Sequence, residues 1–354
     1  MTRTYLRPTA FVDTPVGFDG QVTRLAGGMC FFSAYEVITV DGSKRISTTL
    51  VPVDRIGDHP AIARITAPRP ALVLGARTIR LDQPQVMGIL NMTPDSFSDG
   101  GKYGDDVDAA AAVGFAMDAA GAAIIDVGGE STRPGAKPVW EGDEIARTQP
   151  VTERLARGGA VVSIDSRKAS VMEAALSVGA AIVNDVSALC FDKLALALMV
   201  RSGCPLIIMH SPDAAKTLHD GPIAADPLIE TYDWLDARID ALVAAGIDRA
   251  RIIVDPGIGF GKSVAANLAI MNGLAMFHGL GCPVLLGASR KRFIGALSNE
   301  APVDARLGGS LAVAIKAAEQ GAQIIRVHDV PETVQALRIW RGMRDQGLVN
   351  ETNG

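Results

Sequence analysis

From about residue 72 onward, the chain repeats one unit: a short apolar run that ends in a polar residue or a glycine-rich turn, followed by an alanine-rich amphipathic stretch. Near-continuous apolar runs are typical of strands buried on both faces, in a parallel sheet covered by helices. The predicted strands are Val86–Asn91, Ala123–Val127, Val161–Asp165, Ala181–Asn184, Pro205–His210, Arg251–Asp255, Pro283–Ser289 and Gln323–His328.

Helical stretches separate these runs, for example Asp106–Ala120, Lys168–Val178, Ala225–Ala245 and Gly309–Gln320, and Pro331–Arg344 closes the series. Eight strand–helix units in about 275 residues favour an α/β fold of the (β/α)8 TIM-barrel type. A doubly wound sheet of the same length is the structural alternative. We expect residues 71–354 to form the barrel.

The first 70 residues follow a different pattern and are expected to be a small β-containing N-terminal extension of unknown role. Met29–Val40 and Arg45–Val53 look like two strands joined at an Asp41-Gly42 hairpin turn. The segment His59–Pro70 carries three prolines, which indicates a linker or an irregular docking segment. Because two strands alone are marginally stable, we expect this piece to pack on the barrel or on a partner chain.

Charge and composition exclude several classes of partner. The chain has 34 basic and 39 acidic side chains and no basic stripe, which argues against nucleic acid as the main partner. No apolar run approaches the roughly 20 residues of a membrane span, and no signal-peptide core follows Met1. The four cysteines form no CxxC pair, so we expect reduced thiols in a cytoplasmic protein rather than a zinc site.

Polar residues stand at the end of every predicted strand. In a (β/α)8 barrel, catalytic groups project from the carboxyl ends of the strands, although Asp or Asn at any one position can simply cap the next helix. Acceptors and amides in this set suit a flat nitrogen-rich ring, and its cations suit a phosphate or carboxylate. The strand-end residues are Asn91, Asp126, Asp165, Asn184, His210, Asp255, Ser289 with Lys291, and Arg326 with His328.

Three glycine-containing loops add to this pattern. The segments 91–101 and 128–135 are polar, and the second combines hydroxyls, Arg133 and glycines as anion-holding loops do, with plain connecting loops as the alternative. Segment 255–262 fails both the P-loop and the dinucleotide pattern, because Pro256 and Lys262 stand where glycines are needed. Its glycines predict a tight turn that brings backbone close to a ligand.

These motifs resemble the dihydropteroate synthase family of pterin-binding TIM barrels over about residues 72–347. The resemblance is carried by Met87–Gly101, Asp126–Gly135, Ile164-Asp165-Ser166, Asn184-Asp185, Met209-His210, Asp255–Lys262, Gly287–Lys291 and Arg326–Asp329. It implies a transferase of folate biosynthesis that condenses 6-hydroxymethyl-7,8-dihydropterin diphosphate with 4-aminobenzoate, releasing diphosphate. It also implies Mg²⁺, a cytoplasmic homodimer without nucleic-acid or membrane partners, and a sulfonamide target.

Family roles can be carried over by motif position. Asp165, Asp255, Lys291 and Asn91 are the expected catalytic residues, and Asn91 is the expected metal ligand. The expected pterin-binding residues are Asp165, Asn184, Met209, Asp255 and Lys291. The expected diphosphate-binding residues are Asn91, Arg326 and His328. The expected aminobenzoate-binding residues are Phe97, Thr132, Arg133, Pro134, Ser289 and Lys291.

Two stretches depart from the family pattern. Segment 211–219 replaces the usual turn after the fifth strand, so that loop is expected to differ in shape, and the extension lies outside the family core. Two other functions stay open at this point. A methyltetrahydrofolate-binding methyltransferase would share the pterin-reading residues without needing the diphosphate-side loops, and a non-catalytic paralogue would typically have lost loop residues.

Overall fold

The computed structural model describes residues 2–92, 106–222 and 224–348. Within these ranges, eight short strands form one parallel sheet, and each overlaps a strand expected from the sequence. They are β7 (Gln85–Asn91), β8 (Ile124–Gly128), β9 (Val162–Asp165), β10 (Ile182–Asp185), β11 (Leu206–Met209), β12 (Ile252–Asp255), β13 (Leu285–Gly287) and β14 (Ile324–Val327).

The sheet curls until its two outer strands meet. Neighbours follow the order β12-β11-β10-β9-β8-β7-β14-β13. A parallel bridge between Val254 and Val284 joins β12 to β13, and the Val254 N–H donates to the Pro283 carbonyl at 2.9 Å. The fold is therefore the (β/α)8 barrel expected from the sequence and not the doubly wound alternative.

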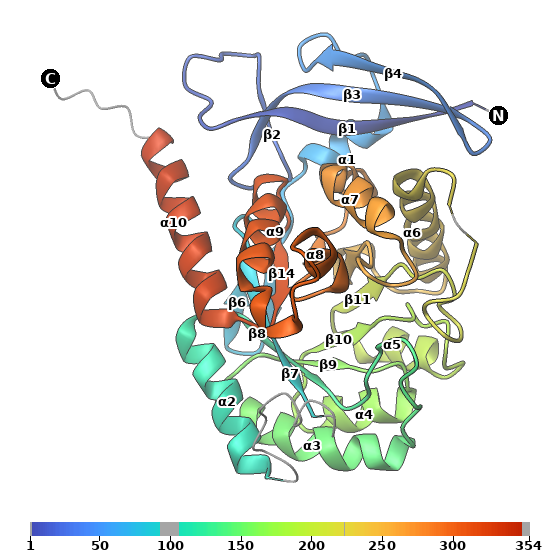
Figure 1. Cartoon of the computed structure of the whole chain (residues 1–354), viewed down its shortest axis with the longest axis vertical. Helices are drawn as coiled ribbons and strands as arrows, with labels where there is room; N and C mark the ends of the chain where they lie inside the picture. The colour runs from blue at the N-terminus through green and yellow to red at the C-terminus, as the bar shows by residue number, and fades with distance from the viewer. Residues whose placement is uncertain (1, 93–105, 223, 349–354) are drawn as a thin grey trace, which may run out of the picture.

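Helices surround this barrel close to where the sequence predicts them (Figure 1). Acidic and hydroxyl caps set several of their starts: the Asp106 side chain accepts from the Ala109 N–H, and Ser263 caps the Ala266 N–H. None of the helices in the described ranges combines the length and apolarity of a bilayer span. The barrel helices are α2 (Val107–Ala120), α3 (Glu141–Arg157), α4 (Ala169–Ser177), α5 (Ala195–Ser202), α6 (Pro227–Ala244), α7 (Val264–Asn272), α8 (Arg292–Leu297), α9 (Leu307–Glu319) and α10 (Val330–Leu348), with 3₁₀ turns η2 (Arg249–Arg251), η3 (Leu274–Leu280) and η4 (Val303–Ala305).

The barrel interior is apolar at the end where the strands begin. A short hairpin, β5 (Leu72–Leu74) with β6 (Arg77–Ile79), plugs this end with Leu72, Ile79 and Leu81. One buried apolar residue on or beside each strand packs against the plug: Met87, Ile124, Val161, Ile182, Ile207, Ile253, Leu285 and Ile324. Because strand side chains alternate between faces, the residues two further along each strand also face the interior.

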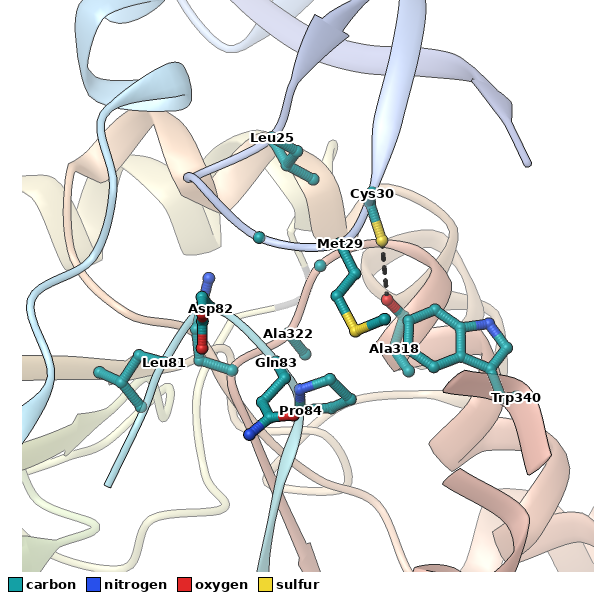
Figure 2. Close-up of a pocket in the computed structure, with 13 residues that line it drawn as sticks. Leu25, Met29, Cys30, Leu81, Asp82, Gln83, Pro84, Ala318, Ala322 and Trp340 are labelled. Carbon is teal, nitrogen blue, oxygen red and sulfur yellow. Dashed lines mark hydrogen bonds between the residues drawn. The ribbon is translucent and has the colours of Figure 1, made fainter. Parts of the chain in front are cut away.

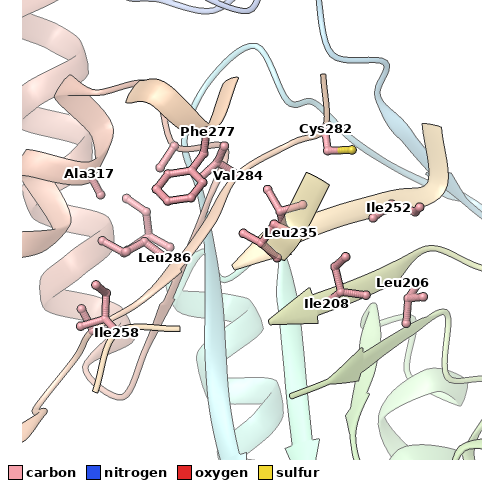
Figure 3. Close-up of a cluster of buried hydrophobic side chains, with 14 of the residues drawn as sticks. Leu206, Ile208, Leu235, Ile252, Ile258, Phe277, Cys282, Val284, Leu286 and Ala317 are labelled. Carbon is pink, nitrogen blue, oxygen red and sulfur yellow. The ribbon is translucent and has the colours of Figure 1, made fainter. Parts of the chain in front are cut away.

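A second, larger core lies between the strands and the helices. Figure 3 shows part of it, where Leu206, Ile208 and Ile252 of β11 and β12 meet Leu235 of α6, and where Phe277 lies near Leu286. The same cluster continues into the N-terminal residues, because it includes Phe32 and Ile65. The extension therefore shares the hydrophobic core of the barrel.

The extension is an antiparallel sheet with a short helix. Its elements are β1 (Thr2–Val12), β2 (Thr23–Arg24), β3 (Phe31–Asp41), β4 (Lys44–Pro52) and α1 (Pro60–Thr66). The β3–β4 hairpin turns at Gly42, which has a φ of +59°. The central strand β3 pairs with β1 on one edge and with β4 and β2 on the other.

Two local expectations for the extension were wrong. The two-strand piece contains a long third strand, β1, which Arg3, Arg7 and Pro8 concealed because charges and proline are uncommon in buried strands. The segment His59–Pro70 is not wholly irregular: Pro60 occupies the first turn of α1, where its missing N–H costs nothing, and the His59 side chain caps the Ala61 N–H.

The N-terminal sheet lies against the barrel near α6 and α7 (Figure 1). Polar contacts hold it there at several points. Asp233 of α6 accepts from the Tyr5 hydroxyl at 2.7 Å and from Arg3 at 2.6 Å. Arg69 is buried and donates to the carbonyls of Arg64 and His278, so it ties the end of α1 to η3. A small crevice lined by Leu25, Cys30 and Trp340 marks the seam, and in it the Cys30 thiol donates to the Ala318 carbonyl (Figure 2).

We predict that Phe32→Ala destabilises the whole molecule. Phe32 has no exposed surface and packs against Phe11 and Tyr35, so its truncation should lower the free energy of unfolding by about 3–5 kcal/mol. Urea unfolding followed by tryptophan fluorescence and circular dichroism should show one shared transition that moves to lower urea. A shifted early transition with an unmoved later one would mean that the extension unfolds independently.

Candidate functional site

The side chains that face the barrel interior change from apolar to polar within two residues along the strands. Asp126, Asn184, Asp255 and Arg326 each lie two residues beyond a member of the apolar layer, on the same face of their strand. All four lie at the carboxyl ends of their strands, where a (β/α)8 barrel carries its active site. The site is thus the upper part of the barrel interior.

Arg326 is the centre of this polar layer. Its Nε donates to Asp126 Oδ2 at 2.6 Å, and its Nη2 donates to Asp165 Oδ2 at 2.7 Å. Asn184 Nδ2 donates to the same Asp126 oxygen at 3.0 Å. Asp126 is fully buried, and its Oδ1 has no hydrogen-bond partner among the described residues, which leaves an acceptor for a ligand.

Charges crowd this layer and shift its proton affinities. Burial raises the pKa of Asp165 to about 7; the Arg326 guanidinium lowers it, and the Asp126 carboxylate raises it further. Burial also raises the pKa of Asp255, although Lys291 and the Gly257 N–H lower it. These carboxyl groups are poorly solvated, so a ligand that supplies N–H donors replaces what water provides elsewhere.

Asp255 and Lys291 belong to a second group on the same layer. Asp255 Oδ1 accepts from the Gly257 N–H at 2.7 Å. The Lys291 ammonium donates to the Ile258 carbonyl and lies 4.5 Å from the centre of the Phe260 ring. Burial lowers the pKa of Lys291 to about 8, against the effect of Asp255.

The glycine-rich segment after β12 forms the tight turn expected of it. Gly257, Gly259 and Gly261 have φ values of +68°, +85° and +57°, which favour glycine. Lys262 is partly buried beneath the turn and donates to the carbonyls of Gly257, Phe260 and His210 at 2.8, 3.3 and 3.3 Å. Burial lowers the pKa of Lys262 to about 7. This lysine organises the turn that presents Asp255.

His328 and Ser289 face each other beyond β14 and β13. Ser289 Oγ accepts from the His328 backbone N–H at 3.3 Å and lies 3.1 Å from His328 Nδ1. Burial, together with the Arg326 and Arg290 cations, lowers the pKa of His328 to about 3. The imidazole is therefore neutral at physiological pH.

Asn91 ends β7 close to the carboxylate group. A Cβ placed on Gly128 would lie 3.7 Å from both Asn91 Oδ1 and Asp165 Oδ2, so these two oxygens approach the same point. Met209 is buried and clusters with Val186 and Leu218. Phe97, expected at the aminobenzoate site, lies outside the described residues.

The loop after β8 carries Thr132, Arg133 and Pro134, and the last two are exposed. The root of this loop is held by buried charges: Glu130 accepts from Arg167 and Lys168, and Lys168 also bonds Glu144 at 2.6 Å. None of these anchoring residues was singled out from the sequence. Glu130 lies inside a recognised motif, but its partners come from loops that only the fold brings together.

Asp126 and His219 are the other residues that the sequence analysis left without a role. For Asp126 a signal existed, because it stands two residues after Ile124, just as Arg326 follows Ile324. His219 gave no such signal, since it lies in the segment that departs from the family pattern. The expected residues Asp165, Asn184, Asp255, Lys291, Arg326, His328, Ser289 and Asn91 all lie around the same end of the barrel.

Comparison with known proteins shows which family this chain resembles. A family profile described as "Pterin binding enzyme" matches residues 87–328. The dihydropteroate synthase of Escherichia coli K12 is 44% identical over 263 residues, which are 74% of this chain and 92% of that protein. The dihydropteroate synthase of Bacillus subtilis is 42% identical over 266 residues, or 75% of this chain and 90% of that protein.

Solved structures show the same likeness. A Xanthomonas albilineans dihydropteroate synthase with 4-aminobenzoic acid matches with a TM-score of 0.73 and 43% identity, covering 78% of this chain and 98% of that one. A Yersinia pestis dihydropteroate synthase with a sulfonamide drug matches with a TM-score of 0.74 and 42% identity, covering 78% and 100%. The profile begins at residue 87, so the N-terminal sheet lies outside it.

The raised pKa of Asp165 makes a prediction about stability. A carboxyl that ionises near pH 3.8 in the unfolded chain and near 7 in the fold destabilises the native state increasingly between those pH values, and by a constant amount above them. Asp165→Asn removes this penalty while Arg326 keeps Asp126 as its partner. The variant should be about 1–2 kcal/mol more stable than the parent at pH 7.5 and equally stable near pH 4.

Denaturant unfolding of both proteins at several pH values measures this difference. Asp165→Glu is the matched control, since it keeps the charge and should show no gain in stability. If Asp165→Asn were less stable at every pH, Arg326 would hold Asp165 ionised and the upward shift would be wrong.

Proposed function

The chain belongs to the dihydropteroate synthase family of pterin-binding enzymes, and from that premise we propose which of its residues carry each part of the reaction. The enzyme condenses 6-hydroxymethyl-7,8-dihydropterin diphosphate with 4-aminobenzoate to 7,8-dihydropteroate and diphosphate, a transferase step of folate biosynthesis. The observation that carries the residue assignment is the polar layer in the barrel interior, in which the buried Asp126, Asn184 and Asp255 lie with the partly buried Asp165 around Arg326.

The pterin ring binds in the polar layer. Its amino and ring N–H groups are donors that suit Asp165 and Asp255, and its carbonyl and ring nitrogens suit Asn184 and Lys291. Met209 supplies an apolar contact for the flat ring. The free Oδ1 of Asp126 supports this assignment, because a buried acceptor without a partner is satisfied when the ligand brings a donor.

The diphosphate binds beside the pterin, next to Asn91, Arg326 and His328. Arg326 is bonded to the carboxylates of Asp126 and Asp165, and its position beside them allows it to contact the anion as well. The neutral His328 imidazole can donate one hydrogen bond from Nε2 if Nδ1 accepts from Ser289 Oγ, and an approaching anion raises its pKa.

Mg²⁺ is the proposed metal, with Asn91 as its protein ligand. The described residues contain no group of three or more His, Cys, Asp or Glu side chains able to hold a metal ion. Mg²⁺ bound to phosphates needs only one or two protein oxygens and keeps several waters, and the amide oxygen of Asn91 fits that requirement. When bound, Mg²⁺ neutralises charge that develops on the diphosphate.

The chemical step is a substitution at the pterin methylene. Its bond to the diphosphate oxygen breaks with the electron pair leaving on diphosphate. The amine lone pair of aminobenzoate forms the new C–N bond, and the nitrogen then loses one proton to water or to the departing diphosphate. Asp165 and Asp255 favour the electron-poor pterin formed when diphosphate departs early, and Lys291 and Asn91 orient the reacting groups. Aminobenzoate is held by Thr132, Arg133, Pro134, Ser289, Lys291 and Phe97.

Location and assembly complete the proposal. The family resemblance and the four free cysteines support a cytoplasmic protein. A homodimer is expected from the resemblance, and sedimentation equilibrium of the purified chain tests it. The Yersinia pestis relative is solved with a sulfonamide drug, and sulfonamides that mimic aminobenzoate are the expected inhibitors.

The purified chain should release diphosphate only when both pterin diphosphate and 4-aminobenzoate are present. The rate should fall on adding a chelator and return with Mg²⁺, because the leaving group then regains its counter-charge. A continuous diphosphate assay with product identification measures this. Release without aminobenzoate would show a hydrolase, and the absence of release with folded protein would show a non-catalytic paralogue.

Asp255→Asn should lower kcat/KM about ten- to a hundredfold, since a charge-assisted hydrogen bond to the pterin contributes about 1.5–3 kcal/mol. Asparagine keeps an oxygen for the Gly257 N–H, so the turn should remain intact and the melting temperature close to that of the parent. Steady-state kinetics and thermal unfolding separate the two effects. An unchanged kcat/KM in the folded variant would remove Asp255 from the site.

A further inference from the structure

The loop between β11 and α6 contains segment 211–219, which departs from the family pattern. The last residues of this segment pack against the site. Leu218 is buried and forms a cluster with Val186, Met209 and the partly buried Phe260. Its φ is +67°, in a region that a leucine rarely adopts. Surrounding contacts must therefore hold this residue in place, as is common at functional sites.

The next residue, His219, joins two other loops of the site. Its Nδ1 accepts from the Gly261 N–H at 3.3 Å, so the ring proton lies on Nε2, which donates to the Thr132 carbonyl at 2.8 Å. The imidazole also stacks on the Phe260 ring, with centroids 5.4 Å apart and planes at 8°. One side chain thus connects the loop after β8 with the loop after β12.

The neighbouring backbone is shaped to receive this segment. A Cβ on Gly261 would lie 2.5 Å from the His219 carbonyl oxygen, so only glycine allows the two loops to approach this closely. On the other side, Arg167 donates to the Lys216 carbonyl at 3.0 Å. The segment is therefore held from the loops after β8, β9 and β12.

We propose that His219 is a positioning and specificity-determining residue for the second, aromatic carboxylate substrate. It fixes the position of Thr132 relative to Phe260 and Lys291. The Lys291 ammonium lies 4.5 Å from the centre of the Phe260 ring. Within the described ranges, the His219 side chain bonds and stacks only with Thr132, Gly261 and Phe260, so its effect falls on the aminobenzoate side. The inference rests on the proposed placement of aminobenzoate near Thr132 and Lys291.

The test compares the effect of His219 variants on the KM values of the two substrates. His219→Phe keeps a ring to stack on Phe260 and loses both hydrogen bonds, so the KM for 4-aminobenzoate should rise about 3- to 10-fold for each bond lost. The KM for the pterin diphosphate should stay within about twofold of the parent. His219→Gln restores a donor that reaches the Thr132 carbonyl, and should recover most of the aminobenzoate affinity.

A structural readout accompanies the kinetics. Amide hydrogen exchange over residues 131–137 of the ligand-free protein should be faster in His219→Phe than in the parent, and close to the parent in His219→Gln. His219→Asn serves if the Phe variant folds poorly, because asparagine keeps an acceptor for Gly261 but is too short to reach Thr132.

The matched control is His59→Phe, which removes a histidine cap at the Ala61 N–H of α1, far from the site, and should leave both KM values unchanged. Equal KM values for aminobenzoate in the parent, Phe and Asn variants would overturn the proposal, as would equal increases for both substrates. A parent protein that is inactive with both substrates would instead overturn the proposed function.

Discussion

The polar end of this barrel depends on one partly buried cation. Arg326 lies between Asp126 and Asp165, and Asn184 completes the set by bonding Asp126. Without the guanidinium, two poorly solvated carboxylates would face each other, and burying such charges unpaired costs several kcal/mol each. The remaining excess of acceptors, seen in the free Oδ1 of Asp126, is what a pterin with several N–H donors can satisfy. In the proposed pterin site, ligand binding would therefore supply the hydrogen-bond donors that the protein itself does not provide.

The apolar part of the barrel interior stabilises the fold enough to carry this polar layer. Directly beneath it, every strand contributes an apolar side chain, and the β5–β6 hairpin seals the end with Leu72 and Ile79. The polar groups are thus confined to one side of a dry, close-packed layer. Around the rim, Lys262 and the Glu130–Lys168 pair fix loop backbones through buried bonds, so that the side chains they carry are held by rigid neighbours rather than by solvent.

Much of the fold and part of the site could be predicted from the sequence. The strands were readable because parallel strands are apolar on both faces, and residues such as Asp165, Asp255 and Lys291 stood at their ends. Asp126 stood among these strand-end residues but received no role, although its spacing from Ile124 matches that of Arg326 from Ile324. The contacts of His219 and of Glu130 could not be predicted, because they join loops distant in sequence. Strand β1 was missed since the bonds of Arg3 and Arg7 to α6 and α7 of the barrel join residues far apart in the sequence.

The N-terminal sheet limits how far this chain can be shortened toward its barrel. Tyr5 packs edge-on against Tyr232, and Leu25 approaches Gly321 so closely that a Cβ there would lie 2.6 Å from its Cδ2. The barrel surface at this interface is therefore shaped to the sheet that covers it. A barrel without the sheet would expose apolar residues there and would need water-compatible side chains in their place.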